Sequence, residues 1–297
     1  MKKLAGIFLL LSLGACADIE DFFLGGGRLD NEGTYTFSID ELDDLIFDSA
    51  MIFDESEYTL VEMTTTDDLG ESALTYALYL GDPANIATDT VIVYCHGNGG
   101  TVESSFRRAT ALANIGGKGR YGVLVPEYLG FGLAQGQVSE ENMYRGVDAG
   151  VAWLESQGLT SDRLIYYGVS LGSVSSVGLT SDPRTLTPEK LMLEAPIAGV
   201  ATLSQDVVGL ALPASFFTSE NPMDNLSKME RISQPVLIVH GDKDNYIDYE
   251  SNGIALYEAY RGSSGSFHTV IGANHVNVPE TMGFTEYEEV LLKFITQ

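Results

Sequence analysis

The chain is predicted to be an α/β protein with a doubly wound, mostly parallel sheet. Its 297 residues are 44% hydrophobic, which suits one large globular domain. From residue 57 onward, eight short runs with strand-like composition alternate with segments of helical character. Near-continuous Val, Ile and Leu strands separated by helices are typical of a parallel sheet that is covered on both faces.

The eight expected strands fall into an edge pair and a parallel set. Runs 58–67 and 74–80 alternate apolar and polar residues across a short turn region, so we expect them to form an antiparallel edge. The remaining runs are dominated by apolar residues and are expected to be buried. They cover 90–95, 121–128, 163–169, 190–196, 235–241 and 266–272.

One helix is predicted in detail between the fourth and fifth strands. Ser139 can cap its N-terminus, and Glu140 and Glu141 carry negative charge at the positive end of the helix dipole. Apolar side chains then repeat at helical spacing, so we expect one face of the helix to be buried. They are Met143, Val147, Val151 and Leu154.

The first residues have the pattern of an export signal. Lys2 and Lys3 precede a ten-residue apolar stretch, 4–13, and small residues follow it. A helix needs about 20 apolar residues to span a bilayer, so this stretch is too short to cross one.

The end of this segment, LGAC at 13–16, resembles the bacterial lipobox. That resemblance implies a lipoprotein signal over 1–15, cleavage before Cys16 and lipid attachment to its thiol. The protein would then be held at the bacterial cell envelope, facing the periplasm or the exterior. The alternative is ordinary secretion, with Ala15 and Ala17 forming an A-x-A cleavage site.

Charge and composition exclude nucleic acid as a partner and indicate which residues form the folded domain. The chain carries 42 acidic and 16 basic side chains, a formal net charge of −26, so nucleic acid is excluded and membrane contact is expected through the lipid only. Residues 16–33 are acidic and then glycine-rich, as in a flexible tether, which leaves 34–297 for one domain. Cys95 lies in an apolar run and is expected to be a buried structural thiol.

The stretch YYGVSLGS, 166–173, carries the strongest chemical signal. Ser170 is flanked by Gly168 and Gly172, a strand-like run leads into it, and a helix-like run of small residues follows. A sharp strand–turn–helix connection of this kind exposes a serine hydroxyl as a nucleophile. Serine is inert at neutral pH, so the hypothesis also requires a base, a carboxylate and oxyanion donors.

With this motif in its context, the chain resembles the α/β-hydrolase family, in which nucleophile, acid and histidine follow in that order. Four histidines are present, and His275 lies just beyond the last expected strand, where the family carries its general base. His268 falls inside a strand-like run and is expected to be a packed or edge residue. The resemblance covers about residues 57–295 and implies an eight-stranded sheet with helices on both faces and a short cap, about 201–234.

The resemblance also supplies the acid. The stretch HGDKDNYID, 240–248, follows a strand and offers Asp242, Asp244 and Asp248. In the family the carboxylate usually falls four residues after the strand-end histidine, which is Asp244 here. The other two aspartates are interpreted as solvated loop charges. Asp244 would hold one tautomer of His275 and stabilise its protonated form.

The oxyanion donors implied by the resemblance are the backbone N–H groups of Asn98 and Leu171. Asn98 lies in HGNGG, 96–100, which follows a strand, and His96 is interpreted as shaping that loop. The alternative is a plain glycine-rich turn. A further stretch, PEYLGFG at 126–132, resembles the family's D-Y-R-G-Y-G segment, although Glu127 replaces the usual aspartate.

These residues predict a serine hydrolase that cleaves carboxylic esters of short to medium acyl groups through an acyl-enzyme. An aminopeptidase-like or amidase-like activity is the enzymatic alternative, and a non-catalytic binding lipoprotein is the alternative from another class. The histidines lack metal-ligand spacing and no dinucleotide fingerprint is present, so neither metal nor cofactor is expected. The expected partner is a small ester or peptide substrate, and the sequence predicts no oligomeric state.

Overall fold

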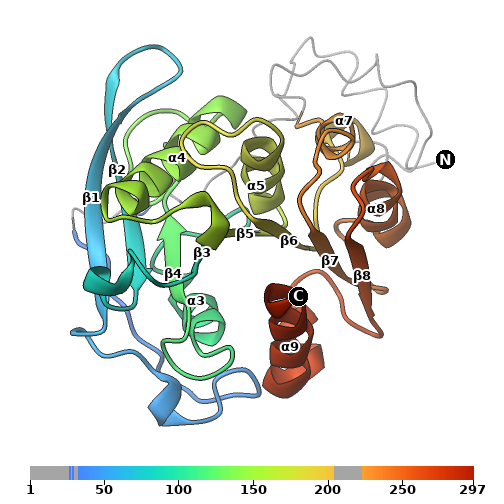
Figure 1. The fold of residues 1–297 in the computed structure, drawn as a ribbon, viewed down its shortest axis with the longest axis horizontal. Coiled ribbons are helices and arrows are strands. Elements are labelled where there is room, and N and C mark those ends of the chain that lie inside the picture. The colour runs from blue at the N-terminus through green and yellow to red at the C-terminus, as the bar shows by residue number, and fades with distance from the viewer. Residues whose placement is uncertain (1–26, 28, 30–32, 204–222) are drawn as a thin grey trace, which may run out of the picture.

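A computed structural model of the chain describes residues 27, 29, 33–203 and 223–297. Its eight strands form one sheet in the order β1-β2-β4-β3-β5-β6-β7-β8 (Figure 1). β2 runs antiparallel to both β1 and β4, and all other neighbouring strands are parallel. The predicted mostly parallel α/β sheet with an antiparallel edge is therefore confirmed.

All eight expected strands are present, and their ends differ from the expected ones by no more than two residues. The largest shortening is in the fourth strand, where the chain leaves the sheet before Glu127. The strands are β1 (Tyr58–Thr66), β2 (Ser72–Leu80), β3 (Val91–Cys95), β4 (Gly122–Pro126), β5 (Leu164–Val169), β6 (Lys190–Glu194), β7 (Val236–Gly241) and β8 (Gly265–Val270).

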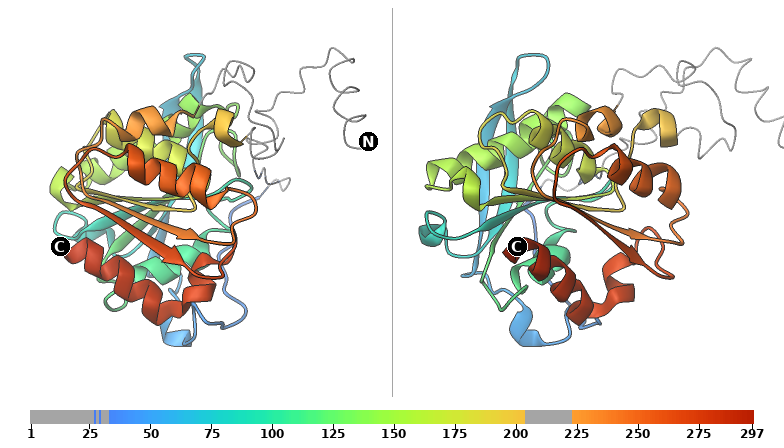
Figure 2. Two further views of the ribbon diagram at one scale, coloured as in Figure 1. Left: turned by 90° about the vertical axis from the view of Figure 1, so that its right-hand side faces the viewer. Right: turned by 45° about the vertical axis from the view of Figure 1, so that its right-hand side comes forward.

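Helices cover both faces of the sheet (Figures 1 and 2). The layer on one face contains α4 (Glu140–Ser156), α5 (Gly172–Ser181), α7 (Asn225–Met229) and α8 (Ala255–Ala259), which pack in one apolar core. The opposite layer contains α3 (Phe106–Ala113) and α9 (Val278–Thr296), which share a second core. Shorter helical turns are η1 (Ser49–Met51), η2 (Pro83–Asn85), η3 (Ser161–Arg163) and η5 (Tyr249–Ile254). The sheet is therefore buried on both sides.

The predicted helix after β4 is confirmed as α4. The Ser139 side chain accepts a hydrogen bond from the backbone N–H of Asn142, which caps the helix as expected. The apolar repeat faces the sheet and is buried along its length. Its last buried member, Leu154, lies two residues before the helix ends at Ser156.

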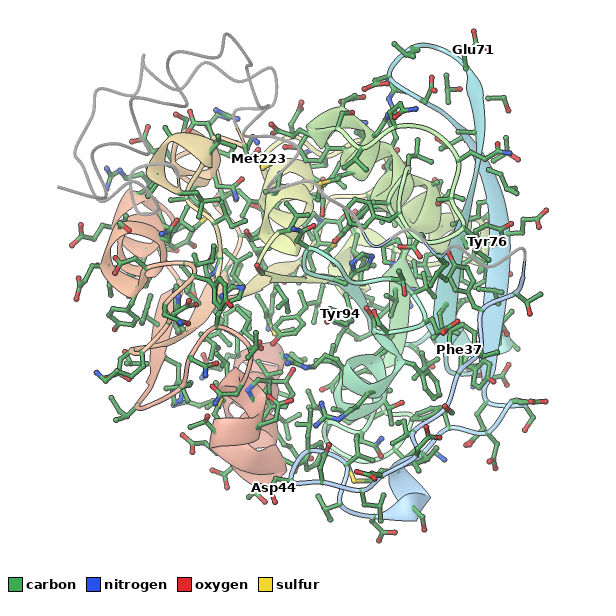
Figure 3. The ribbon with its side chains drawn as sticks, turned by 180° about the vertical axis from the view of Figure 1, so that it is seen from behind. Phe37, Asp44, Glu71, Tyr76, Tyr94 and Met223 are labelled. Carbon is green, nitrogen blue, oxygen red and sulfur yellow. The ribbon has the colours of Figure 1, made fainter. Side chains whose placement is uncertain are left out.

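The segment before β1 packs on the layer that contains α3 and α9. Leu45 and Ile46 are fully buried there, although the family resemblance did not extend to this part of the chain. Aromatic rings tie the segment to the edge of the sheet: the ring centroid of Phe37 lies 5.3 Å from that of Tyr58 (Figure 3). This packing makes the segment part of the apolar core.

Some expectations fall on residues that the structure does not describe. They are the signal over 1–15, Cys16, most of the tether over 16–33, and residues 204–222 of the cap. Within the described ranges, none of the helices combines the length and the apolar character that crossing a bilayer requires.

Candidate active site

The structure brings Ser170, His275 and Asp244 into one hydrogen-bonded row. Ser170 Oγ lies 2.9 Å from His275 Nε2, and His275 Nδ1 lies 2.8 Å from Asp244 Oδ2. The three residues follow β5, β8 and β7 respectively. Loops after parallel strands meet at the carboxyl edge of the sheet, which explains how residues far apart in the sequence come together.

Ser170 sits in a strained turn that only small neighbours permit. Its φ is 51°, in the left-handed region that non-glycine residues rarely adopt. A Cβ atom at Gly168 would lie 2.1 Å from Ser176 Oγ, and one at Gly172 would lie 2.0 Å from the carbonyl oxygen of Cys95. The two glycines of the motif are therefore required by the close approach of α5 to β3 and β5.

The carboxylate of Asp244 is buried and fully engaged. Its Oδ1 accepts from the backbone N–H groups of Tyr246 and Ile247, at 2.9 and 2.8 Å. Its Oδ2 accepts from His275 and from His240 Nε2, the latter at 3.1 Å. Burial alone would raise the pKa of this carboxyl, but the hydrogen bonds from the two histidines outweigh it and hold the pKa well below its usual range. Asp244 is therefore ionised at neutral pH.

His240 is a positioning residue that the sequence analysis used only as a landmark. Its Nε2 lies 3.1 Å from both Asp244 Oδ2 and the carbonyl oxygen of Ile247. A carbonyl oxygen can only accept, so Nε2 carries the proton and also donates to the carboxylate. The imidazole of His240 thus helps to fix the orientation of Asp244 through Oδ2, the oxygen that also contacts His275. The sequence signal that could have revealed this role is the position of His240 four residues before Asp244.

The other two aspartates of the loop contact neither histidine. Asp242 accepts from the backbone N–H of Gly272 at 2.6 Å and so joins the acid loop to the histidine loop. Asp248 caps the turn η5 through two backbone N–H groups. Both were interpreted as solvated charges, but each holds local backbone in place. His268 lies on the edge strand β8, as expected, 3.4 Å from Glu286.

The loop after β3 lies against the serine. A Cβ atom at Gly97 would stand 3.4 Å from Ser170 Cβ, which places the loop in contact with the nucleophile. Gly97, Asn98 and Leu171 line the same cavity as Ser170. Among the residues that the structure describes, the backbone N–H groups of Asn98 and Leu171 have no acceptor. Both are therefore available to an oxygen atom bound beside Ser170.

The buried carboxylate of Glu127 holds the loop after β3 in place. Glu127 is fully buried, and its Oε1 lies 3.1 Å from His96 Nε2. Its Oε2 accepts from the Tyr35 hydroxyl at 2.8 Å and from the backbone N–H of Val102 at 3.1 Å. The ring of His96 also packs on Tyr128, with centroids 4.3 Å apart. His96 thus shapes the loop, and Tyr35 joins the N-terminal segment to it.

Replacing Glu127 with glutamine is expected to loosen the oxyanion loop. The amide keeps the volume but replaces one of the two carboxylate oxygens with an NH₂ group, which disturbs the contacts with His96, Tyr35 and the Val102 amide, so we expect a loss of about 1–3 kcal/mol in the free energy of unfolding and a lower kcat. Urea unfolding and ester hydrolysis measure the two effects. The matched control is Glu103→Gln, which changes a more exposed carboxylate that accepts from the Thr36 amide at 2.7 Å. Equal effects of the two variants would contradict the assigned role of Glu127.

A cavity of about 700 Å³ opens at the serine. Its walls are mainly apolar, and the Tyr246 ring lies beside His275 with centroids 5.7 Å apart. Two charged residues, Arg108 and Glu194, also line it, and sequence reasoning missed both. The lining residues include Val169, Leu171, Ile197, Ile247 and Val276.

Cys95 is buried as predicted, and burial raises the pKa of its thiol to about 12, so it stays protonated at neutral pH. In residues 33–203 and 223–297, no three His, Cys, Asp or Glu side chains are arranged to hold a metal ion.

Comparison with known proteins supports the architecture. No protein-family model matches the chain. The α/β-hydrolase domain-containing protein 17B of Xenopus tropicalis is 30% identical over 210 residues, covering 69% of this chain and 66% of that protein. Its human counterpart is 29% identical over the same extent, and protein 17C of Mus musculus is 28% identical over 172 residues. The match spans slightly less than two thirds of the length of the two 17B proteins and about half of the length of the 17C protein.

Solved structures share the fold at low sequence identity. An esterase of Pyrococcus furiosus has a TM-score of 0.63 at 17% identity, covering 89% of this chain and 97% of its own. A bromoperoxidase of Bacillus anthracis has a TM-score of 0.58 at 18% identity, covering 80% and 100%. An acylaminoacyl peptidase of Pyrococcus horikoshii has a TM-score of 0.57 at 12% identity, covering 80% and 41%. The likeness establishes the fold and leaves the substrate open.

Proposed function

We propose that the chain is a member of the α/β-hydrolase superfamily, which its fold and its relatives support, and that it is a serine hydrolase of carboxylic esters. The observation that carries the proposal is the row from Ser170 through His275 to Asp244, next to two unengaged backbone N–H groups. The mainly apolar cavity at Ser170 favours short to medium acyl groups.

The geometry supports a two-step acyl transfer. His275 Nε2 takes the proton of the Ser170 hydroxyl while Oγ attacks the ester carbonyl carbon. The carbonyl oxygen becomes an oxyanion that accepts from the amides of Asn98 and Leu171. Collapse breaks the ester bond, and the protonated His275 gives its proton to the departing alcohol. Water then repeats the sequence on the acyl-enzyme and releases the acid, with Asp244 orienting the imidazole throughout.

A fluorophosphonate probe tests the proposal directly, because only an activated serine reacts with it rapidly. We expect labelling at Ser170 together with turnover of nitrophenyl esters. A panel of aminoacyl nitroanilides covers amide and peptide hydrolysis, which the acylaminoacyl peptidase neighbour brings into consideration. Nitroanilide turnover above that of every ester would assign the enzyme to the peptidases. Absence of labelling and of all turnover would favour a non-catalytic binding protein.

Activity on nitrophenyl esters is expected to be highest for acyl chains of about two to eight carbons. Each buried methylene adds about 0.8 kcal/mol, or about fourfold in kcat/KM, until the apolar wall ends. The cap over 201–234 is short, and only its ends, 201–203 and 223–234, are described. The measurement is kcat/KM against chain length. Rates that still rise beyond about twelve carbons would instead indicate a true lipase.

We also propose that the protein is anchored to the bacterial cell envelope by a lipid on Cys16, which the lipobox-like stretch at 13–16 supports. The Cys16→Ser variant should leave the membrane fraction or fail to mature, because a multiply acylated cysteine binds a bilayer far more firmly than a single chain. Fractionation and mass spectrometry of the N-terminus measure this. A mature, unlipidated N-terminus at Asp18 would indicate plain secretion.

A further inference from the structure

A nearly buried ion pair lines the cavity beside the nucleophile. Arg108 comes from α3 and Glu194 from the end of β6, and Arg108 Nη1 lies 3.0 and 2.8 Å from the two carboxylate oxygens of Glu194. The side chains are only 14% and 2% exposed. Glu194 also accepts from the Tyr167 hydroxyl, and its backbone carbonyl accepts from the N–H of Ser170 at 2.9 Å. The ion pair is therefore attached to the end of β6, where the backbone also accepts a hydrogen bond from Ser170.

Arg108 has hydrogen-bond donors to spare. A guanidinium carries five N–H groups, and the contact with Glu194 uses Nη1 alone. Within the described ranges, no group accepts from Nε or Nη2, and neither atom is enclosed without a partner. Arg108 is also one of the residues that line the cavity beside Ser170. The adjacent Arg107 differs, since its Nε and both of its terminal nitrogens engage Asp43 and Glu280 near the surface.

The guanidinium carbon of Arg108 also lies 5.9 Å from the centroid of the Tyr287 ring, but packing of this kind does not require a buried charge. Taking an ion pair out of water costs several kcal/mol, and apolar side chains of similar volume usually serve packing as well or better. An Arg108 held by Glu194 at one nitrogen and open at the others is oriented for a further acceptor. The carboxylate acts as the support, and the open edge of the guanidinium acts as the binding group.

The charge balance selects the kind of acceptor. Glu194 cancels the charge of Arg108, and the chain as a whole carries −26, so an anion gains little from entering this cavity. A neutral carbonyl oxygen can accept from the open edge without placing a third charge there. We propose that Arg108 recognises a second, neutral carbonyl oxygen of the substrate, a few bonds from the scissile ester. The inference rests on the proposed function, because it concerns the specificity of the same site.

The test is a matched series of nitrophenyl esters: pentanoate, 4-oxopentanoate and hemisuccinate. These place a methylene, a neutral carbonyl or a carboxylate at a similar distance from the scissile bond, and each rate is divided by its spontaneous hydrolysis. We expect kcat/KM for 4-oxopentanoate to exceed that for pentanoate by about tenfold or more, with hemisuccinate below 4-oxopentanoate. A second pair tests the alcohol side: the butanoate of 5-hydroxypentan-2-one carries the second carbonyl, and the butanoate of pentan-1-ol lacks it. Comparison of the two pairs shows whether Arg108 binds a carbonyl on the acyl side or on the alcohol side of the ester.

The Arg108→Met variant is expected to abolish the preference for the carbonyl-bearing ester. Arg107→Met is the matched control on the same helix and should keep the preference. Fluorophosphonate labelling of Ser170 shows that each variant is folded. Should Arg108→Met fail to fold, Arg108→Lys retains the charge while losing the planar fork, and most of the preference should still disappear.

Three results would contradict the inference, the first two in whole and the third in the kind of acceptor. The first is a wild-type enzyme that hydrolyses esters yet shows no preference for the carbonyl in either pair. The second is a preference that survives in a labelled Arg108→Met variant. Hemisuccinate turnover above that of 4-oxopentanoate would overturn the assignment of a neutral acceptor. A wild-type protein with neither labelling nor ester turnover would instead contradict the proposed function, which separates the two failures.

Discussion

Replacing Ser170 with alanine is expected to reduce ester hydrolysis to the background rate and to abolish fluorophosphonate labelling. The variant removes the only oxygen that lies within hydrogen-bond reach of His275 Nε2 among the described residues. Loss of the nucleophile in comparable hydrolases costs about 10⁶ in kcat. The fold should persist, because the hydroxyl contributes one side-chain hydrogen bond and the Ser170 backbone keeps its contact with Glu194. Steady-state kinetics and circular dichroism measure both parts.

The matched control is Ser181→Ala in the helix that follows. Ser181 Oγ donates only to the carbonyl of Gly178 in its own helix, so its loss should leave turnover within a few fold. Comparable turnover in Ser170→Ala and the wild type would remove Ser170 from the mechanism. In that case the strained φ of 51° at this residue would need another explanation.

Much of the fold and part of the site followed from local sequence patterns. Buried parallel strands are apolar along their whole length, so their runs were visible without any partner. The loops after such strands meet at one edge of the sheet, and there the structure brings together Ser170, Asp244 and His275, the residues that the family resemblance implied. The close approach of helix α5 to the sheet is likewise visible in the sequence, because it requires glycine at positions 168 and 172.

The remaining features depend on contacts between distant elements. Glu127 was placed inside a strand-like run, yet it turns inward to partners 25 to 92 residues away in sequence. Arg108 and Glu194 are 86 residues apart; Glu194 falls inside the expected buried run 190–196, but no local pattern pairs it with Arg108 or predicts that Arg108 is enclosed. A charged side chain usually indicates a solvated surface. Only the packing of α3 against the sheet reveals that these charges are enclosed.

Replacing Asp244 with asparagine is expected to lower kcat by about 10⁴. The carboxylate accepts from His275 Nδ1 and so leaves Nε2 without a proton, ready to accept from Ser170. An amide can offer its NH₂ group to Nδ1 instead, which favours the tautomer with the proton on Nε2. That tautomer cannot take the serine proton. Nitrophenyl ester kinetics over a range of pH measure the loss.

Two neighbouring aspartates provide controls of the same chemistry. Asp242→Asn and Asp248→Asn change carboxylates that bind backbone N–H groups of nearby loops and contact neither histidine. We expect each to retain activity within about tenfold, because the tautomer of His275 is set by Asp244 alone. If Asp242→Asn proves the costlier substitution, Asp244 is not the acid of the site.

Stability against pH gives Asp244 a second, independent signature. Its pKa in the folded protein is held well below the usual range, chiefly by hydrogen bonds from His240 and His275 acting against burial. A depressed carboxyl pKa stabilises the fold fully above the unfolded-state pKa, about 3.9, and the contribution is lost as pH falls toward the folded-state pKa. The wild type should therefore lose more free energy of unfolding between pH 6 and pH 3 than Asp244→Asn, so the gap between them narrows in acid. Urea unfolding at each pH measures it, and a gap that stays constant would show that Asp244 is not ionised and engaged as the structure has it.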